Sequence, residues 1–303
     1  MRWEDARRSD NIEDRRGDDQ YADAGGGGMM VGGGGLGIGT MIILGLIAYF
    51  LGINPSILIG GAEMVNNARG GGQVVQQQAQ APQRDMAAPK DQVGQFVAAI
   101  LGENEDVWSE VLPKQKGIKF KPSPIVMFNG ATASACGTAQ SAMGPFYCPL
   151  DKKIYLDTSF FQDMQRRFGG GGDFAYAYVI SHEMGHHIQD QLGLLPKVQE
   201  AEQNASSKAE ANALSVRVEL MADCLAGVWA ANANQKWNNI DQNDVQKAIN
   251  TAQAIGDDRL QQASRGYVVP DAFTHGSSQQ RVTWFMQGMK SGQIDGCNTF
   301  AKQ

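Results

Sequence analysis

Two histidines separated by one helical turn, with a glutamate directly after the first, form the most chemically informative stretch of this chain. They are His182, Glu183 and His186, and the flanking residues contain no proline and favour a helix. Residues four apart in a helix share one face, so both imidazoles can reach a single ion. A zinc hydrolase needs two neutral imidazoles, an open position for water and a nearby carboxylate. We therefore predict that His182 and His186 are metal ligands and that Glu183 is the general base.

The helix that carries this motif should begin near Asp173, which follows a glycine run and is a good N-cap residue. It should continue to about Leu192 and end at Gly193. Three of the chain's four histidines lie in it. The third, His187, should face away from the ion and be structural. The alternative is a partly buried helix in which the motif occurs by chance.

A second helix, expected over residues 213–230, carries two acids that are also one turn apart, Glu219 and Asp223. Glu219 would complete a His₂Glu zinc site, and Asp223 could accept the outer N–H of a ligating histidine. Such a pair is common on solvated helices. Here, however, the acids lie among apolar residues such as Leu220, where a carboxylate needs a partner. The two motifs together favour a zinc site.

The fourth histidine, His275, lies where a loop should lead into a helix. It could donate a hydrogen bond to the oxyanion of a tetrahedral intermediate, and Tyr267 is a second candidate for that role. The alternative is that His275 only caps the helix. Arg281 could pair with Asp223, with Glu219 or with solvent.

Several local patterns indicate the elements that position these residues. Asp91 should cap a helix with apolar residues at helical spacing. One strand is expected over residues 122–136, beginning with the apolar run 124–128, a second strand at 153–156, and a further helix at 157–168. We predict a mainly helical α+β domain with a small strand element. A strand just before the histidine helix could bind an extended peptide along its edge.

The first ninety residues do not read as globular. Residues 1–35 form a polar and glycine-rich tail, 36–58 are uncharged and long enough to span a bilayer, and 59–89 form a flexible linker before a domain at 90–303. A cleaved signal peptide would not start after more than thirty residues rich in acids. Five arginines precede the span and only Arg69 lies just after it, which predicts a cytoplasmic tail and an extracytoplasmic domain at the bacterial inner membrane.

The four cysteines suit that compartment, because an even number in an extracytoplasmic domain favours disulfides. Three pairings are possible. Cys136 and Cys148 bracket the strand connection and are the obvious pair, which leaves Cys224 for Cys297. A zinc-cysteine site is disfavoured because the chain has no CxxC.

The overall charge excludes one class of partner. The net charge is -6 and the pI is near 5.3, and no basic stripe is present to neutralise phosphates. We therefore expect no nucleic-acid partner.

Six stretches carry a resemblance to a known family: Met1 to Trp3, Asn11 to Gly17, the apolar span, His182 to His187, Glu219 to Cys224 and His275 to Arg281. Over essentially its whole length the chain resembles the bacterial family of putative neutral zinc metallopeptidases. The resemblance implies a single-span membrane protein with a zincin domain of the gluzincin group, with His182, His186 and Glu219 as ligands and Glu183 as base. The final histidine and arginine element is similar to that of HtpX-like and prenyl-protein peptidases, which usually have proline where this chain has Gly276.

These observations predict a membrane-anchored zinc endopeptidase that hydrolyses extracytoplasmic proteins or peptides. Zn²⁺ is the expected cofactor, and a protein or peptide is the expected substrate. The alternative, from a different class, is a catalytically silent zinc-binding scaffold that binds a partner at the membrane.

Overall fold

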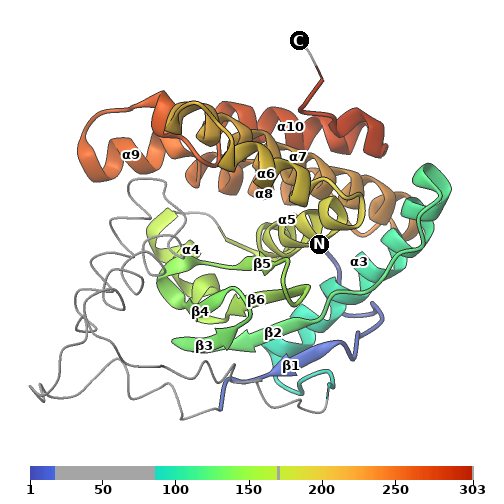
Figure 1. The fold of residues 1–303 in the computed structure, drawn as a ribbon. Helices are drawn as coiled ribbons and strands as arrows, with labels where there is room; N and C mark the ends of the chain where they lie inside the picture. The colour runs from blue at the N-terminus through green and yellow to red at the C-terminus, as the bar shows by residue number, and fades with distance from the viewer. Residues whose placement is uncertain (18–85, 169–170, 302–303) are drawn as a thin grey trace, which may run out of the picture.

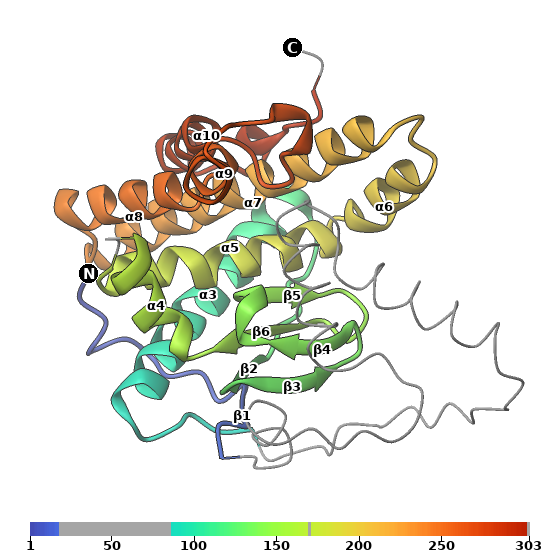
Figure 2. The same ribbon diagram turned by 90° about the vertical axis from the view of Figure 1, so that its left-hand side faces the viewer.

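The computed structural model describes residues 1–17, 86–168 and 171–301, and these residues form three stacked layers (Figures 1 and 2). A sheet forms the first layer, and the histidine helix α5 (Asp173–Gln191) lies on it. The third layer contains α7 (Lys208–Trp237), α8 (Gln242–Ala254) and α10 (Ser278–Ser291). Helix α5 is thus enclosed between the sheet and α7. The predicted class, a mainly helical α+β fold, is confirmed.

The main sheet has the strand order β1-β2-β6-β5. Its first three strands are parallel, and β5 pairs antiparallel with β6 at one edge. The two strands expected from sequence are β2 and β6. The apolar run that precedes Cys136 does not continue as one strand, because Gly130 (φ +79°) turns the chain into a separate hairpin. The strands are β1 (Ile12–Asp14), β2 (Ile125–Phe128), β3 (Ala131–Ser134), β4 (Gly137–Gln140), β5 (Phe146–Cys148) and β6 (Lys153–Asp157).

The first 17 residues belong to the folded domain, so the prediction of a polar tail separate from it is wrong. Strand β1 pairs with β2, with Ile12 opposite Ile125. Trp3 is 9% exposed, packs edge-on against Phe96, and its indole N–H donates to Asp173 at 2.9 Å. The domain therefore includes residues before position 90.

The composition of residues 1–17 favours a solvated tail, because the segment has few apolar residues. In the structure its charged side chains are instead satisfied by specific ion pairs. Arg7 forms ion pairs with Glu105 and Asp106 of helix α3 (Gln92–Lys116). Within the segment, Arg15 and Arg16 pair with neighbouring acids: Arg15 with Glu13, and Arg16 with Asp14. Paired charges can be buried where unpaired ones cannot.

The predicted membrane span at 36–58 lies outside the described residues, as does the linker up to residue 85. Among the residues that are described, no helix combines the length and the apolar character needed to cross a bilayer.

The two helices of the predicted metal site differ slightly from expectation at their ends. Gly172, with φ +106°, is the N-cap of α5, so Asp173 is the first helical residue and not the cap. The carboxylate of Asp173 accepts the indole N–H of Trp3. The helix ends before Gly193, as predicted. Helix α7 is longer than the predicted 213–230, because its first and last turns are polar and carry no apolar periodicity.

The remaining helices follow the sequence in part. Asp91 caps α3 as predicted, and its side chain accepts the N–H of Gly94. The helix expected at 157–168 is α4 (Ser159–Phe168). Two short polar helices were not predicted because they carry too few apolar residues to show a period: α6 (Leu195–Gln203) and α9 (Asp257–Arg265).

Helices α7 and α10 cross with their backbones in contact. A Cβ atom added to Gly288 would lie 1.9 Å from the carbonyl oxygen of Cys224, so no larger residue fits there. The disulfide between Cys224 and Cys297 closes the same crossing, and the disulfide between Cys136 and Cys148 joins the β3-β4 hairpin to β5. Both pairings expected from sequence are therefore present.

Candidate metal centre

The two sequence motifs converge on one point between α5 and α7. The Nε2 atom of His182 lies 3.1 Å from one carboxylate oxygen of Glu219, and the Nε2 atom of His186 lies 3.4 Å from the other. One ligand atom from each residue fits within 4.8 Å of the others. Tetrahedral zinc with bonds of ~2.0–2.1 Å separates its ligand atoms by about 3.3 Å. The three side chains therefore have the spacing of a zinc site.

Close approach of the two helix backbones makes this convergence possible. A Cβ atom on Gly185 would lie only 3.0 Å from the carbonyl oxygen of Ala222, so glycine is the residue that fits between the two histidines. Gly185 is the fourth residue of the HExxH motif, and Ala222 lies between Glu219 and Asp223.

Asp223 contacts the ring nitrogen of His182 that does not face Glu219. Its carboxylate is fully buried and lies 2.9 Å from the Nδ1 atom of His182. It also accepts hydrogen bonds from Arg281, through Nε at 2.9 Å and a terminal nitrogen at 3.0 Å, and from the hydroxyl of Tyr178. Of the three alternatives left open by sequence, Arg281 therefore pairs with Asp223. Because Nδ1 of His182 donates to Asp223, its Nε2 is free to bind a cation.

Gln189 supports the second histidine and was not predicted. Its side-chain N–H donates to the carbonyl of Val218 at 2.7 Å, which turns its oxygen toward Nδ1 of His186 at 2.9 Å. The proton of His186 is thus held on Nδ1, and its Nε2 faces Glu219. Its position three residues after His186, within one helical turn, is the signal that could have identified it.

Glu183 lies beside this group and is almost fully buried, at 7% exposure. Burial raises its pKa, although the neighbouring histidines and a hydrogen bond from the backbone N–H of Tyr147 oppose that rise. Tyr147 is the central residue of β5. The edge strand of the sheet therefore lies directly beside the proposed base.

Opposite charges dominate the titration of the metal-free site. Burial disfavours a charged His182, but Asp223 and Glu219 outweigh it and raise the pKa of His182 to about 10. The pKa of Asp223 falls to about 2, because Arg281 and His182 overcome the opposing effect of burial. Burial also disfavours a charged Glu219, but His186, His182 and His275 outweigh it and hold the pKa of Glu219 well below its usual value. A cation is thus electrostatically favoured between these residues.

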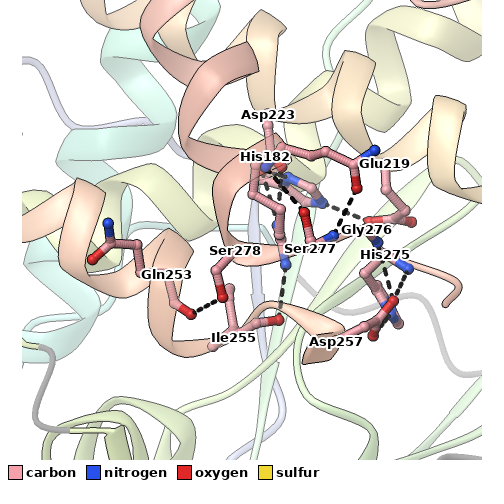
Figure 3. A network of polar contacts seen from close by, with 12 residues as sticks. His182, Glu219, Asp223, Gln253, Ile255, Asp257, His275, Gly276, Ser277 and Ser278 are labelled. Atoms are coloured by element: carbon pink, nitrogen blue, oxygen red, sulfur yellow. Dashed lines mark hydrogen bonds and ion pairs between the residues drawn. The ribbon is translucent and has the colours of Figure 1, made fainter. Parts of the chain in front are cut away.

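His275 lies close to Glu219, and its charge contributes to lowering the pKa of that carboxylate (Figure 3). It does not cap α10, because the side chain of Ser277 does so in a capping box with Gln280. The capping alternative is therefore wrong. The other oxyanion candidate, Tyr267, is 60% exposed and makes no hydrogen bond or ion pair with the metal-site residues described above.

His187 faces away from the metal site, as predicted. It is buried, its Nε2 lies 2.7 Å from the carbonyl oxygen of Lys121, and its Nδ1 lies 3.1 Å from the hydroxyl of Tyr147. Burial lowers its pKa, which favours the neutral ring. His187 therefore helps to hold β5 against α5.

Two imidazoles and a carboxylate around one point, with a buried glutamate beside them, are the donor set of the HExxH zinc metallohydrolases. Sequence comparison gives the family. A family model described as "Putative neutral zinc metallopeptidase" matches residues 1–300, and the chain belongs to that family. The match includes the N-terminal residues that form β1. Family membership also confirms Zn²⁺ as the expected cofactor, which the donor set fits.

Curated relatives extend over most or all of the chain. "Uncharacterized protein YpfJ" of Escherichia coli (strain K12) is 45% identical over 302 residues, which cover 100% of this chain and 99% of the relative. "Uncharacterized protein Rv2575" of Mycobacterium tuberculosis (strain ATCC 25618 / H37Rv) is 40% identical over 215 residues, or 68% of this chain and 70% of the relative. No solved structure matches significantly.

Proposed function

We propose that the protein is a zinc endopeptidase, with His182, His186 and Glu219 as metal ligands and Glu183 as general base. The observation that carries this proposal is the position of Glu183, which is buried beside the three ligands. Zn²⁺ bound there would act as a Lewis acid on the scissile carbonyl and lower the pKa of a coordinated water toward ~7. Glu183 would accept the proton of the attacking water and return it to the leaving amine.

The edge strand β5 supports a peptide as the substrate. It pairs with β6 on one side only, and the backbone N–H of Tyr147 reaches the carboxylate of Glu183. An extended peptide that adds to this edge by main-chain hydrogen bonds would place its backbone carbonyls beside the base. His275, on the α10 side of the site, would donate to the oxyanion that forms.

The proposal is tested with the full chain and an unfolded protein such as casein. Glu183→Gln should retain about one zinc per chain and lose cleavage by ~10²–10⁴-fold, because it removes only the proton acceptor. His186→Ala should lose both zinc and cleavage. A Glu183→Gln protein with full activity would refute the mechanism. A wild-type chain that carries zinc and binds peptides without chelator-sensitive cleavage would support the scaffold instead.

We also propose that the domain is extracytoplasmic and attached to the membrane through residues 36–58. The two disulfides support an oxidising compartment. Because β1 pairs with β2, a single crossing between residues 17 and 86 would put two paired strands on opposite sides of the membrane. We therefore propose that the attachment through residues 36–58 does not cross the membrane from one side to the other, which differs from the single crossing expected from sequence. We therefore place residues 1–17 on the same side as the domain.

Cysteine labelling tests this placement. Asp10 and Lys114 are both exposed, one in the N-terminal segment and one in α3, and all four native cysteines are in disulfides. Asp10→Cys and Lys114→Cys, made separately, should both react with a membrane-impermeant maleimide in intact spheroplasts. Labelling of Lys114→Cys alone would show that the N-terminus crosses the membrane and that β1 is not paired in the cell.

A further inference from the structure

The loop that carries His275 is held by a residue from outside the metal site. Asp257, the first residue of α9, is 8% exposed, and its Oδ2 accepts hydrogen bonds from the backbone N–H groups of Thr274, His275 and Gly276 at 2.7, 2.7 and 3.0 Å. Its own N–H donates to the carbonyl of Gly276 at 2.9 Å. Four hydrogen bonds thus join Asp257 to three successive residues.

The carboxylate of Asp257 also faces the imidazole. Its Oδ1 lies 3.4 Å from Nδ1 of His275 (Figure 3). The hydroxyl of Thr274 lies 3.0 Å from the same nitrogen. The Nε2 atom of His275 makes no hydrogen bond with any residue that the structure describes. One nitrogen of the ring is therefore held, and the other is free to meet a substrate.

These contacts are not needed to start α10. Ser277 and Gln280 already form its capping box, and the neighbouring Asp258 holds the first helical residue through the backbone and hydroxyl of Ser278, both at 2.7 Å. The two neighbouring acids therefore hold different parts of this loop. Asp258 fixes the helix start, and Asp257 fixes the residues that present His275.

Gly276 explains how this loop comes so close to the metal site. Its φ of +94° is favourable only for glycine, and an added Cβ would lie 3.1 Å from a methyl carbon of Leu220, the residue after Glu219. Proline, with φ near −65°, could not adopt this conformation. The loop thus lies against α7 at the turn that carries the third predicted ligand.

From these contacts we propose that Asp257 is the positioning residue for His275, holding its backbone and its Nδ1 so that Nε2 faces the reacting carbonyl. This inference rests on the proposed peptidase function. Asp257 acts through His275 and touches neither metal ligands nor substrate. Replacing Asp257 should therefore lower peptidase activity in a chain that has His275, but not in a chain in which His275 has been replaced.

Kinetics of four variants test this dependence, with zinc content measured for each. His275→Ala should lower kcat/KM by ~10²–10³-fold, the usual effect of removing one oxyanion donor. Asp257→Ala should lower it by ~10-fold or more, mainly in kcat, and the double variant should be no worse than His275→Ala. Asp258→Ala, the matched control, should leave kcat/KM unchanged. Additive losses in the double variant would overturn the proposal.

A spectroscopic measurement covers the case in which Asp257→Ala does not fold. Asp257→Asn keeps an oxygen for the three amides but turns an N–H toward Nδ1, so Nδ1 of His275 must become an acceptor. The ¹⁵N spectrum of the four histidine rings should show a changed tautomer for His275 alone. An unchanged His275 signal would overturn the proposal. If the wild-type chain cleaves nothing, the peptidase function fails, while this spectrum still decides whether Asp257 holds the imidazole.

Discussion

Replacement of Asp223 by asparagine tests the reasoning about the metal centre most directly. The carboxylate is fully buried and accepts from Nδ1 of His182, from the hydroxyl of Tyr178 and twice from the side chain of Arg281. Asparagine has nearly the same shape but no charge. The neutral side chain would leave the buried guanidinium of Arg281 without a counter-ion. The N–H₂ of the asparagine amide would also face at least one of the donors that the carboxylate now accepts.

Two separate losses should follow. Removing one partner of a buried ion pair usually costs ~3–5 kcal/mol, because the remaining charge is uncompensated. The side chain of Arg281 is only 5% exposed, so solvent cannot replace the lost carboxylate. Loss of the residue that orients a ligating histidine usually weakens metal binding ~10–100-fold. We expect both effects in Asp223→Asn.

Urea unfolding of the metal-free protein, with disulfides intact, measures the first effect, and zinc competition with a chelator measures the second. The control is Asp223→Asn combined with Arg281→Met, which removes the unpaired charge at similar side-chain length. The double variant should recover most of the unfolding free energy but not the zinc affinity. A loss below about 1 kcal/mol in Asp223→Asn, with unchanged zinc affinity, would refute this account of the network.

Three further predictions concern protons and packing. The pKa of metal-free His182 is raised to about 10, so zinc binding at pH 7 should displace at least its proton. Calorimetry in buffers of different ionisation heat should show this release as a buffer-dependent binding heat. A binding heat that is the same in every buffer would contradict the prediction. Burial raises the pKa of Glu103 from 4.5 to about 7, so its contribution to stability is present below pH 4.5 and is lost as pH rises through 7. Glu103→Gln should therefore stabilise the metal-free protein by roughly 2–3 kcal/mol at pH 8 and by little near pH 4, and equal gains at both pH values would argue against a titrating Glu103. Gly288→Ala should lower the Tm, because its Cβ would lie 1.9 Å from the Cys224 carbonyl oxygen, whereas Gly17→Ala, with open space around it, should not.

The sequence was most informative where the relevant contacts are local. One turn of helix separates His182 from His186 and Glu219 from Asp223, so a regular helix is enough to place each pair on one face. The role of His187 as a structural residue follows from the same geometry. The pairing of the disulfides was also within reach, because four cysteines allow only a few arrangements.

The tertiary structure decided whatever depends on residues distant along the chain. Arg281 reaches Asp223 only because α10 crosses α7 at backbone contact, and Asp257 reaches the His275 loop only because α9 folds back onto it. The N-terminal segment is the clearest case. Its composition is that of a solvated tail, yet a single strand, one tryptophan and several ion pairs hold it in the domain. Such contacts have no period in the sequence, because each depends on where a distant partner lies after folding.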